Sequence, residues 1–322
     1  MAPEPEGVPP AGSTGDSGLP PEVGETVVTV GTFDGVHLGH RAVLEEIVER
    51  ARRRRRASIL VTFDRHPLTV VRPEDAPPLL TTPDEKKEIL VQTGLDYVAF
   101  VRFTREVSRL SPEAFVRGYL VGRFRVRELV IGYDHGFGRG RSGDIETLRT
   151  LGRELGFDVD VVGEVRADGD EISSTRIRTA IAEGRIEDAV RGLGRPYSFE
   201  GPVVHGLGRG RDLGFPTANL EPPGGRKLLP PSGIYAVQAS FRTKIRDGLL
   251  HVGPRPTFAG SPPSVELYVL DFDGDLYGER VRVEVLSRLR DVRPFASPEE
   301  LVEQMRRDAE EGRAFFEARR SG

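Results

Sequence analysis

The chain has 322 residues, of which 37% are hydrophobic and 30% are charged, and its formal net charge is −4. This length favours two domains, the composition is typical of a soluble globular protein, and no apolar run approaches the roughly 18 residues that a membrane-spanning helix needs. The negative charge argues against a protein that coats nucleic acid or an anionic membrane, so small-molecule partners are expected. Cysteine is absent, which excludes disulfides and Cys-based metal sites and fits a reducing compartment such as the cytoplasm.

The N-terminal segment, residues 1–24, is crowded with Pro and Gly and contains no Lys or Arg. It has neither the basic start nor the apolar stretch of a signal peptide. Because it also lacks a periodic apolar pattern, we interpret it as a disordered tail. We therefore expect deletion of Met1 to Pro21 to leave activity and thermal stability unchanged.

Residues 25–192 alternate between strand and helix patterns. An apolar run at 27–30 leads through a Gly-rich turn into a stretch with apolar residues at helical spacing, namely Leu44, Ile47, Val48 and Ala51. Further strands are expected near 59–63, 97–103, 129–132 and 159–162. A capping box at Thr82 and Glu85 and an N-cap at Ser111 mark two helix starts. This alternation predicts a parallel sheet with right-handed crossovers.

Residues 193–322 have a different pattern, and we place the domain boundary between Gly192 and Ser198. Short strands separated by Gly and Pro are expected at 199–204, 233–240, 249–253, 265–271 and 280–286. They predict an antiparallel, closed or nearly closed barrel. A final helix is expected to begin at the capping box of Ser297 and Glu300. The side chains expected to pack this helix are Leu301, Met305, Phe315 and Phe316.

A Gly-rich segment follows the first expected strand and reads Gly31-Thr32-Phe33-Asp34-Gly35-Val36-His37-Leu38-Gly39-His40. It lies at the carboxyl edge of the sheet and at a helix N-terminus, where α/β folds bind phosphates. The histidines, three residues apart, can stabilise charge on a phosphorus atom under attack. The nucleotide-binding candidates here are Gly31, Phe33, Asp34 and Gly39, and the catalytic candidates are His37 and His40. Two alternatives stay open: a metal site completed by His66 and carboxylates, or a purely structural turn.

A second segment at the same edge of the sheet gathers hydroxyl groups and a guanidinium at a helix N-terminus. It contains Ser174, Thr175 and Arg176, which are suited to the β- and γ-phosphates of a nucleotide. Alone, such a segment is also an ordinary helix cap. The segments 63–67 and 132–140 follow two other expected strands and lie at the same edge.

The second half contains its own set of polar residues. Thr217 and Asn219 are two residues apart, so in an extended chain they face one side and can hold Mg²⁺ together with phosphate oxygens. The loop before them supplies three further binding candidates, Gly206, Gly208 and Arg211. Glu266 lies in an otherwise apolar strand and is the best candidate for a general base in this half. The alternative is an ordinary outward-facing strand residue.

Together these motifs resemble the bifunctional bacterial riboflavin kinase / FMN adenylyltransferase family, also called FAD synthetase. The resemblance implies a Rossmann-like nucleotidyltransferase domain at 25–192 and a kinase barrel with a terminal helix at 193–322. It also implies that riboflavin, FMN and ATP are the substrates and that Mg²⁺ is required. Carried over by position, His37, His40, Ser174 and Arg176 serve adenylyl transfer. Thr217 and Asn219 then hold Mg-ATP, and Glu266 deprotonates the ribityl hydroxyl.

Two positions depart from the pattern of that family. His251 stands where Asn is more common, and Asp64-Arg65-His66-Pro67 stands where Glu-Pro-His-Pro is common. Two rival functions were weighed. A nucleotidyltransferase with another substrate is disfavoured by the second half of the chain. A nucleic-acid-binding protein is suggested only by the five consecutive arginines at 52–56, which we interpret as the solvated end of a helix. The sequence indicates no oligomeric state.

Overall fold

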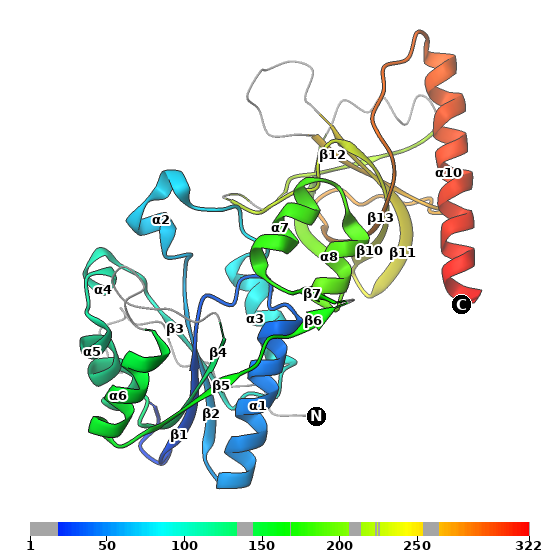
Figure 1. The fold of residues 1–322 in the computed structure, drawn as a ribbon. Helices are drawn as coiled ribbons and strands as arrows, with labels where there is room; N and C mark the ends of the chain where they lie inside the picture. Colours follow the sequence, from blue (N-terminus) through cyan, green and yellow to red (C-terminus); the bar gives the residue numbers. More distant parts are fainter. Residues whose placement is uncertain are drawn as a thin grey trace. The chain divides into compact units, whose positions relative to one another are not determined.

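The computed structural model describes residues 19–133, 144–167, 169–205, 214–222, 224, 226–253 and 264–321. The chain divides into two compact units, Met1–Ser174 and Thr175–Gly322. The first is built on a parallel sheet and the second on a β-barrel (Figure 1).

The sheet of the first unit has five parallel strands in the order β3-β2-β1-β4-β5, as the alternating pattern predicted. Its strands are β1 (Thr26–Val30), β2 (Ala57–Phe63), β3 (Tyr97–Val101), β4 (Val126–Gly132) and β5 (Asp158–Val162). The helices are α1 (Leu38–Arg54), α2 (Leu68–Val71), α3 (Pro83–Val91), α4 (Arg105–Ser108), α5 (Pro112–Phe115) and α6 (Ile145–Leu155), with the helical turns η1 (Pro73–Asp75) and η2 (Val116–Val121). The short strands β6 (Arg166–Ala167) and β7 (Asp170–Glu171) pair separately. The strand order reverses between β1 and β4, the point at which such sheets bind ligands.

Helices cover both faces of this sheet (Figure 1). Consecutive β1 residues point to opposite faces, so Val27 packs with the α1 and α3 side chains and Val28 packs with those of η2 and α6. On α1 the predicted apolar positions Leu44, Ile47 and Ala51 are buried. Burial on both faces explains why every β1 residue is inaccessible to solvent.

The predicted helix starts are present. Thr82 Oγ1 accepts a hydrogen bond from Glu85 N at 3.2 Å, and a Glu85 carboxylate oxygen accepts from Thr82 N at 2.8 Å. Ser111 Oγ likewise accepts from Ala114 N at 3.1 Å. These local bonds fix where α3 and α5 begin.

The last six residues of the segment predicted as a disordered tail, residues 19–24, are part of the folded structure. Leu19 is 5% exposed and belongs to the hydrophobic cluster on the α6 face of the sheet, and Val23 packs against the same cluster. An isolated Leu among Pro and Gly carries no periodic signal, so the sequence pattern does not predict its burial. Deletion of Met1 to Pro21 would remove Leu19, so the expectation of unchanged stability is withdrawn.

We expect Leu19→Ala to lower the free energy of unfolding by about 2 to 4 kcal/mol, because the substitution leaves a cavity in the core. Urea unfolding would measure the change, and Glu22→Ala, three residues away and exposed, is the matched control. A Leu19 variant as stable as the Glu22 variant would show that this segment adds nothing to the core.

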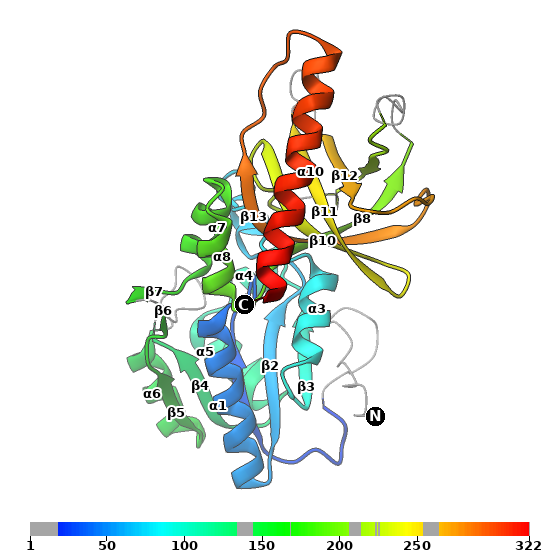
Figure 2. The same ribbon diagram turned by 90° about the vertical axis from the view of Figure 1, so that its right-hand side faces the viewer.

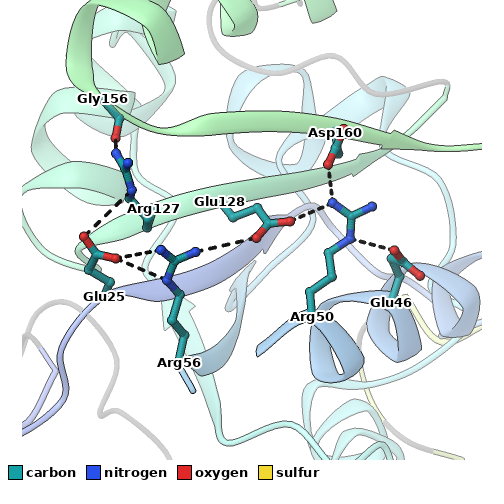
Figure 3. A network of polar contacts seen from close by, with 8 residues as sticks. All are labelled: Glu25, Glu46, Arg50, Arg56, Arg127, Glu128, Gly156 and Asp160. Carbon is teal, nitrogen blue, oxygen red and sulfur yellow. Dashed lines mark hydrogen bonds and ion pairs between the residues drawn. The ribbon is translucent and has the colours of Figure 1, made fainter. Parts of the chain in front are cut away.

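The five arginines at 52–56 lie at the end of α1, and four of them have the solvent exposure that was predicted. Arg52 to Arg55 are exposed, as expected for a solvated helix end. Arg56 is only 17% exposed and forms ion pairs with Glu25 at 2.8 Å and with Glu128 at 3.7 Å (Figure 3). Arg56 follows the end of α1, so the helical spacing of the sequence could not predict its ion pairs.

Glu128 is the centre of this network. Its carboxylate on β4 is 2% exposed and also accepts a hydrogen bond from Arg50 Nη1 at 2.7 Å. Arg50 bonds further to Glu46 and Asp160 (Figure 3). Burial alone would lower the pKa of Arg50, but these carboxylates hold it above its ordinary value. A buried carboxylate needs such partners.

The second unit is a closed barrel of strands in the order β10-β11-β12-β9-β8-β13, with antiparallel neighbours. Its strands are β8 (Tyr197–Val204), β9 (Ala218–Leu220), β10 (Gly233–Phe241), β11 (Lys244–Gly253), β12 (Ser264–Val269) and β13 (Arg280–Arg290). The alternating Val281, Val283 and Val285 are fully buried in its interior, as their spacing predicted. The helices of this unit are α7 (Ser174–Ala182), α8 (Ile186–Leu193) and α10 (Pro298–Ser321).

Helix α8 packs on the barrel, since Ile186 is part of the barrel core. This helix lies in the predicted range of the first domain, 25–192, apart from its last residue, because a helical pattern does not tell which sheet a helix covers.

Helix α10 lies along the outside of the barrel (Figure 2). Of the residues expected to pack it, Phe316 is buried, and Leu301, Met305 and Phe315 are half-buried. Asp308 was not expected on this face, yet it is 4% exposed and forms two hydrogen bonds with Arg290 of β13 at 2.6 and 2.5 Å. This pair anchors the helix to the barrel.

Candidate active sites

The loop between β1 and α1 follows a strained path at the carboxyl edge of the sheet. Phe33 and Val36 have φ angles of 47° and 40°, although neither is glycine and Val36 is β-branched. Each such residue costs about 1 to 3 kcal/mol and persists only where its surroundings hold it. Both side chains are buried. At Gly31, a Cβ atom would lie 2.9 Å from the Phe33 ring, so a larger residue here would force that ring to move.

His37 and His40 lie together in this loop. Their rings stack at a centroid distance of 3.7 Å. The Phe33 ring also stacks with the His40 ring, at a centroid distance of 4.5 Å. His37 also caps α1, because its Nδ1 accepts a hydrogen bond from His40 N at 3.3 Å. A neutral His37 with Nδ1 as acceptor carries its proton on Nε2, which can donate to a phosphate oxygen.

The Asp34 carboxylate is 5% exposed and holds the neighbouring loop. Its oxygens accept hydrogen bonds from Leu80 N and Thr81 N, both at 3.0 Å, and from the Thr81 hydroxyl at 3.2 Å. Gly35 N in turn donates to Thr81 Oγ1 at 3.1 Å. Asp34 therefore ties the loop after β1 to the loop before α3.

The serine-rich segment reaches the same loop. Ser174 Oγ donates to the backbone oxygen of Asp34 at 2.9 Å. The backbone oxygen of Ile172 lies 3.6 Å from where a Cβ atom of Gly39 would be, and the His37 ring lies 3.2 Å from that point. Thr175 and Arg176 are exposed in the first turn of α7. The structure thus brings Ser174 to the first motif, while most of the 132–140 segment lies outside the described residues.

The candidates of the second half meet on adjacent strands of the barrel. Glu266 of β12 is directly opposite Asn219 of β9, and Thr217 Oγ1 donates to Glu266 Oε2 at 3.3 Å. Val265 and Leu267 point into the barrel core, so Glu266 lies on the outer face of its strand. All three candidates are half-buried. The loop candidates Gly206, Gly208 and Arg211 lie outside the described residues.

His251, one of the two departures from the family pattern, lies beside this group. It is opposite Glu266 in the pairing of β11 with β12. Burial lowers the pKa of His251, an effect that the Glu266 carboxylate opposes and Arg290 adds to. His251, which stands where Asn is common in the family, is therefore next to Glu266, the candidate base.

A pocket opens beside Thr217 at the barrel wall. It is lined by Thr217 and Asp275 and by aromatic and apolar side chains that include Phe272 and Tyr277. The Tyr277 ring stacks with His205 at 4.2 Å. Apolar and aromatic walls with a few polar residues are typical of a ligand pocket.

Lys86 is a further polar residue at the carboxyl edge of the first sheet, and the motifs did not predict it. This residue is 8% exposed and lines a pocket at the carboxyl edge of the sheet together with Thr32, Asp34, Asp64, Arg65 and His66. Its position gave a signal, because Lys86 precedes Ile89 and Leu90 by three and four residues and so belongs to the buried stripe of α3.

Comparisons with known proteins match both halves of the chain. The FAD synthetase family matches residues 19–176, and the riboflavin kinase family matches residues 193–316. The "Bifunctional riboflavin kinase/FMN adenylyltransferase" of Escherichia coli (strain K12) is 40% identical over 90% of this chain and 92% of its own length. The protein of the same name from Listeria monocytogenes is 38% identical, again over 90% and 92%.

The chain belongs to the bifunctional riboflavin kinase / FMN adenylyltransferase family. It carries an FAD synthetase domain followed by a riboflavin kinase domain, as the sequence motifs predicted. A solved structure called a macrolide-efflux protein, from Streptococcus pneumoniae, is also similar, with a TM-score of 0.84 and 31% identity over 92% of this chain and 95% of that chain. Among the described residues of this chain, no helix is long and apolar enough to cross a membrane.

Proposed function

We propose that this chain phosphorylates riboflavin to FMN in its second half and adenylylates FMN to FAD in its first half, using ATP for both reactions. The observation that carries the proposal is the tandem match to both enzyme families, at 19–176 and 193–316. We keep the functional boundary between Gly192 and Ser198 in this proposal, because the match to the riboflavin kinase family begins at residue 193.

In adenylyl transfer, a phosphate oxygen of FMN attacks the α-phosphorus of ATP, and the bond from that phosphorus to the bridging oxygen breaks, releasing pyrophosphate. FMN is already an anion, so the reaction needs donors to the developing charge rather than a base. His37 and His40 are the proposed donors, and Ser174, Thr175 and Arg176 are proposed to bind the leaving phosphates. Gly31, Phe33 and Gly39 shape the loop, and Asp34 holds it in place.

In the kinase reaction, the ribityl hydroxyl of riboflavin attacks the γ-phosphorus of ATP and loses its proton to Glu266, while ADP leaves. The Thr217 hydroxyl and the Asn219 amide oxygen fit Mg²⁺, which takes oxygen ligands and usually keeps few from the protein and the rest from phosphates and water. Bound there, the ion would neutralise charge on the ATP phosphates. The Thr217–Glu266 bond supports this arrangement, because it places the base beside the proposed metal ligand. Gly206, Gly208 and Arg211 are proposed to cover the nucleotide.

One incubation tests the proposal. Pure protein is mixed with riboflavin, ATP and Mg²⁺, and the flavins are separated by chromatography over time. FMN should appear first and FAD should follow. If neither forms, the proposal fails, and if only one forms, the other domain is inactive in this chain. We also propose a cytoplasmic location and no nucleic-acid partner, which the absence of cysteine and the net charge of −4 support.

A further inference from the structure

Lys86 joins three elements at the carboxyl edge of the first sheet. Its Nζ donates to the backbone oxygens of Thr32 at 3.2 Å and Phe63 at 3.0 Å, and to the Thr62 hydroxyl at 3.2 Å. Thr32 belongs to the loop after β1, and Thr62 and Phe63 end β2. A single ammonium thus ties α3 to the end of β2 and to the loop that follows the neighbouring strand β1.

The number of N–H donors on the Lys86 ammonium limits what this group can bind. A lysine ammonium has three N–H donors and no acceptor. All three donors match the three protein oxygens around Nζ, so none is left for a substrate. Lys86 therefore acts on the reaction through the loop that it holds.

The charges around Lys86 are mixed. The carboxylates of Asp34 and Asp64 favour its charged form, but burial outweighs them and lowers the pKa of Lys86 to about 8. Arg65 and His66 line the same pocket. From β3, the Phe100 ring lies 5.5 Å from Nζ of Lys86, and the exposed Lys87 lies 5.8 Å from that ring. Holding an ammonium in such a place is costly, and a methionine would fill the same space without that cost.

We propose that Lys86 is a positioning residue for adenylyl transfer, whose ammonium fixes the carbonyl groups of Thr32 and Phe63 and thereby the loop that presents His37 and His40. This inference rests on the proposed adenylyl transfer in the first domain. It assigns a role to a residue whose three ammonium donors are matched by protein oxygens.

A pH dependence follows from the hydrogen count. After deprotonation, the neutral amine of Lys86 has two N–H donors and a lone pair. One of the three oxygens then faces the lone pair, and one hydrogen bond that holds the loop is lost. The phosphates of FMN and ATP have finished titrating by then, since their last pKa is about 6. The rate of FAD formation from supplied FMN should therefore fall above about pH 8.

The effect of Lys86 on stability has the opposite dependence on pH from its effect on the rate of FAD formation. The folded-state pKa of Lys86, about 8, is below its ordinary value of 10.5, so between these values the unfolded chain binds more protons than the folded one. The contribution of this group to stability therefore rises with pH across that window. A fall in activity without a fall in melting temperature is the signature expected of Lys86.

The test compares Lys86→Met, Lys86→Arg and the matched control Lys87→Met in the full chain. Steady-state FAD formation is measured from pH 6.5 to 10, with riboflavin phosphorylation and melting temperature recorded on the same samples. We expect Lys86→Met to lower kcat about 10- to 100-fold at pH 7 and to abolish the alkaline fall. Lys86→Arg, which keeps its charge throughout, should also lack the fall, and Lys87→Met should match the parent.

The inference is overturned if Lys86→Met stays within twofold of the parent, or if the alkaline fall persists in Lys86→Met or Lys86→Arg. Should Lys86→Met not fold, the Arg variant and the parent profile decide the matter. A parent protein that makes no FAD at any pH would refute the proposed function itself, which is a different result.

Discussion

Glu266→Gln should slow FMN formation from riboflavin by about two to four orders of magnitude, the usual effect of removing a positioned general base. The nucleophile is an alcohol that must lose its proton as the bond to phosphorus forms. Gln keeps the size of the side chain and can still accept a hydrogen bond from Thr217, so the geometry around Thr217 and Asn219 is preserved. The rate of FMN formation, followed by chromatography, measures the effect.

Two controls accompany this variant. FAD formation from supplied FMN should continue at the parent rate, because that reaction uses an anionic nucleophile in the other domain. Glu284→Gln is the matched substitution, since Glu284 is another half-exposed glutamate on a barrel strand. It should leave both activities unchanged. If Glu266→Gln phosphorylates riboflavin within a few-fold of the parent, the base is another residue of this domain.

His40→Ala should lower FAD formation from supplied FMN by about two to three orders of magnitude, as for the loss of a donor to charge in the transition state. The kinase activity of the same molecule should be unchanged. Steady-state rates of both reactions on one preparation measure the difference.

His40→Phe separates chemistry from packing. It retains a ring that can stack between Phe33 and His37 but removes the nitrogen donors. It should be as slow as the Ala variant. An active Phe variant would show that His40 serves only to support the loop, and a parallel loss of both activities would indicate a global defect in folding.

Patterns that repeat along an element were sufficient to predict most of the fold. The i, i+3, i+4 spacing of α1, the capping box at Thr82 and the alternation of Val281, Val283 and Val285 all reflect local rules. The parallel sheet, the closed barrel and the terminal helix were confirmed for this reason. The two motif regions were also recognisable, because His37 and His40, or Thr217 and Asn219, lie close together in the chain.

The remainder depends on contacts between distant segments. The tie from Asp34 to Thr81, the burial of Leu19 and the packing of α8 on the barrel each join residues that no local period connects. Lys86 could have been found from its place in the apolar stripe of α3, but its three acceptors lie at the end of β2 and in the loop after β1. Helical spacing alone could not identify them.

The alternation of β12 makes the kinase site a reporter of correct barrel closure. Glu266 points outward only because Val265 and Leu267 point inward, and a shift of one residue against β9 and β11 would turn the carboxylate into the core. A misassembled barrel could retain its strand content while losing the pairing of Glu266 with Asn219. With Glu266 as the proposed base, we therefore expect riboflavin phosphorylation to detect misfolded molecules that a measurement of secondary structure would count as native.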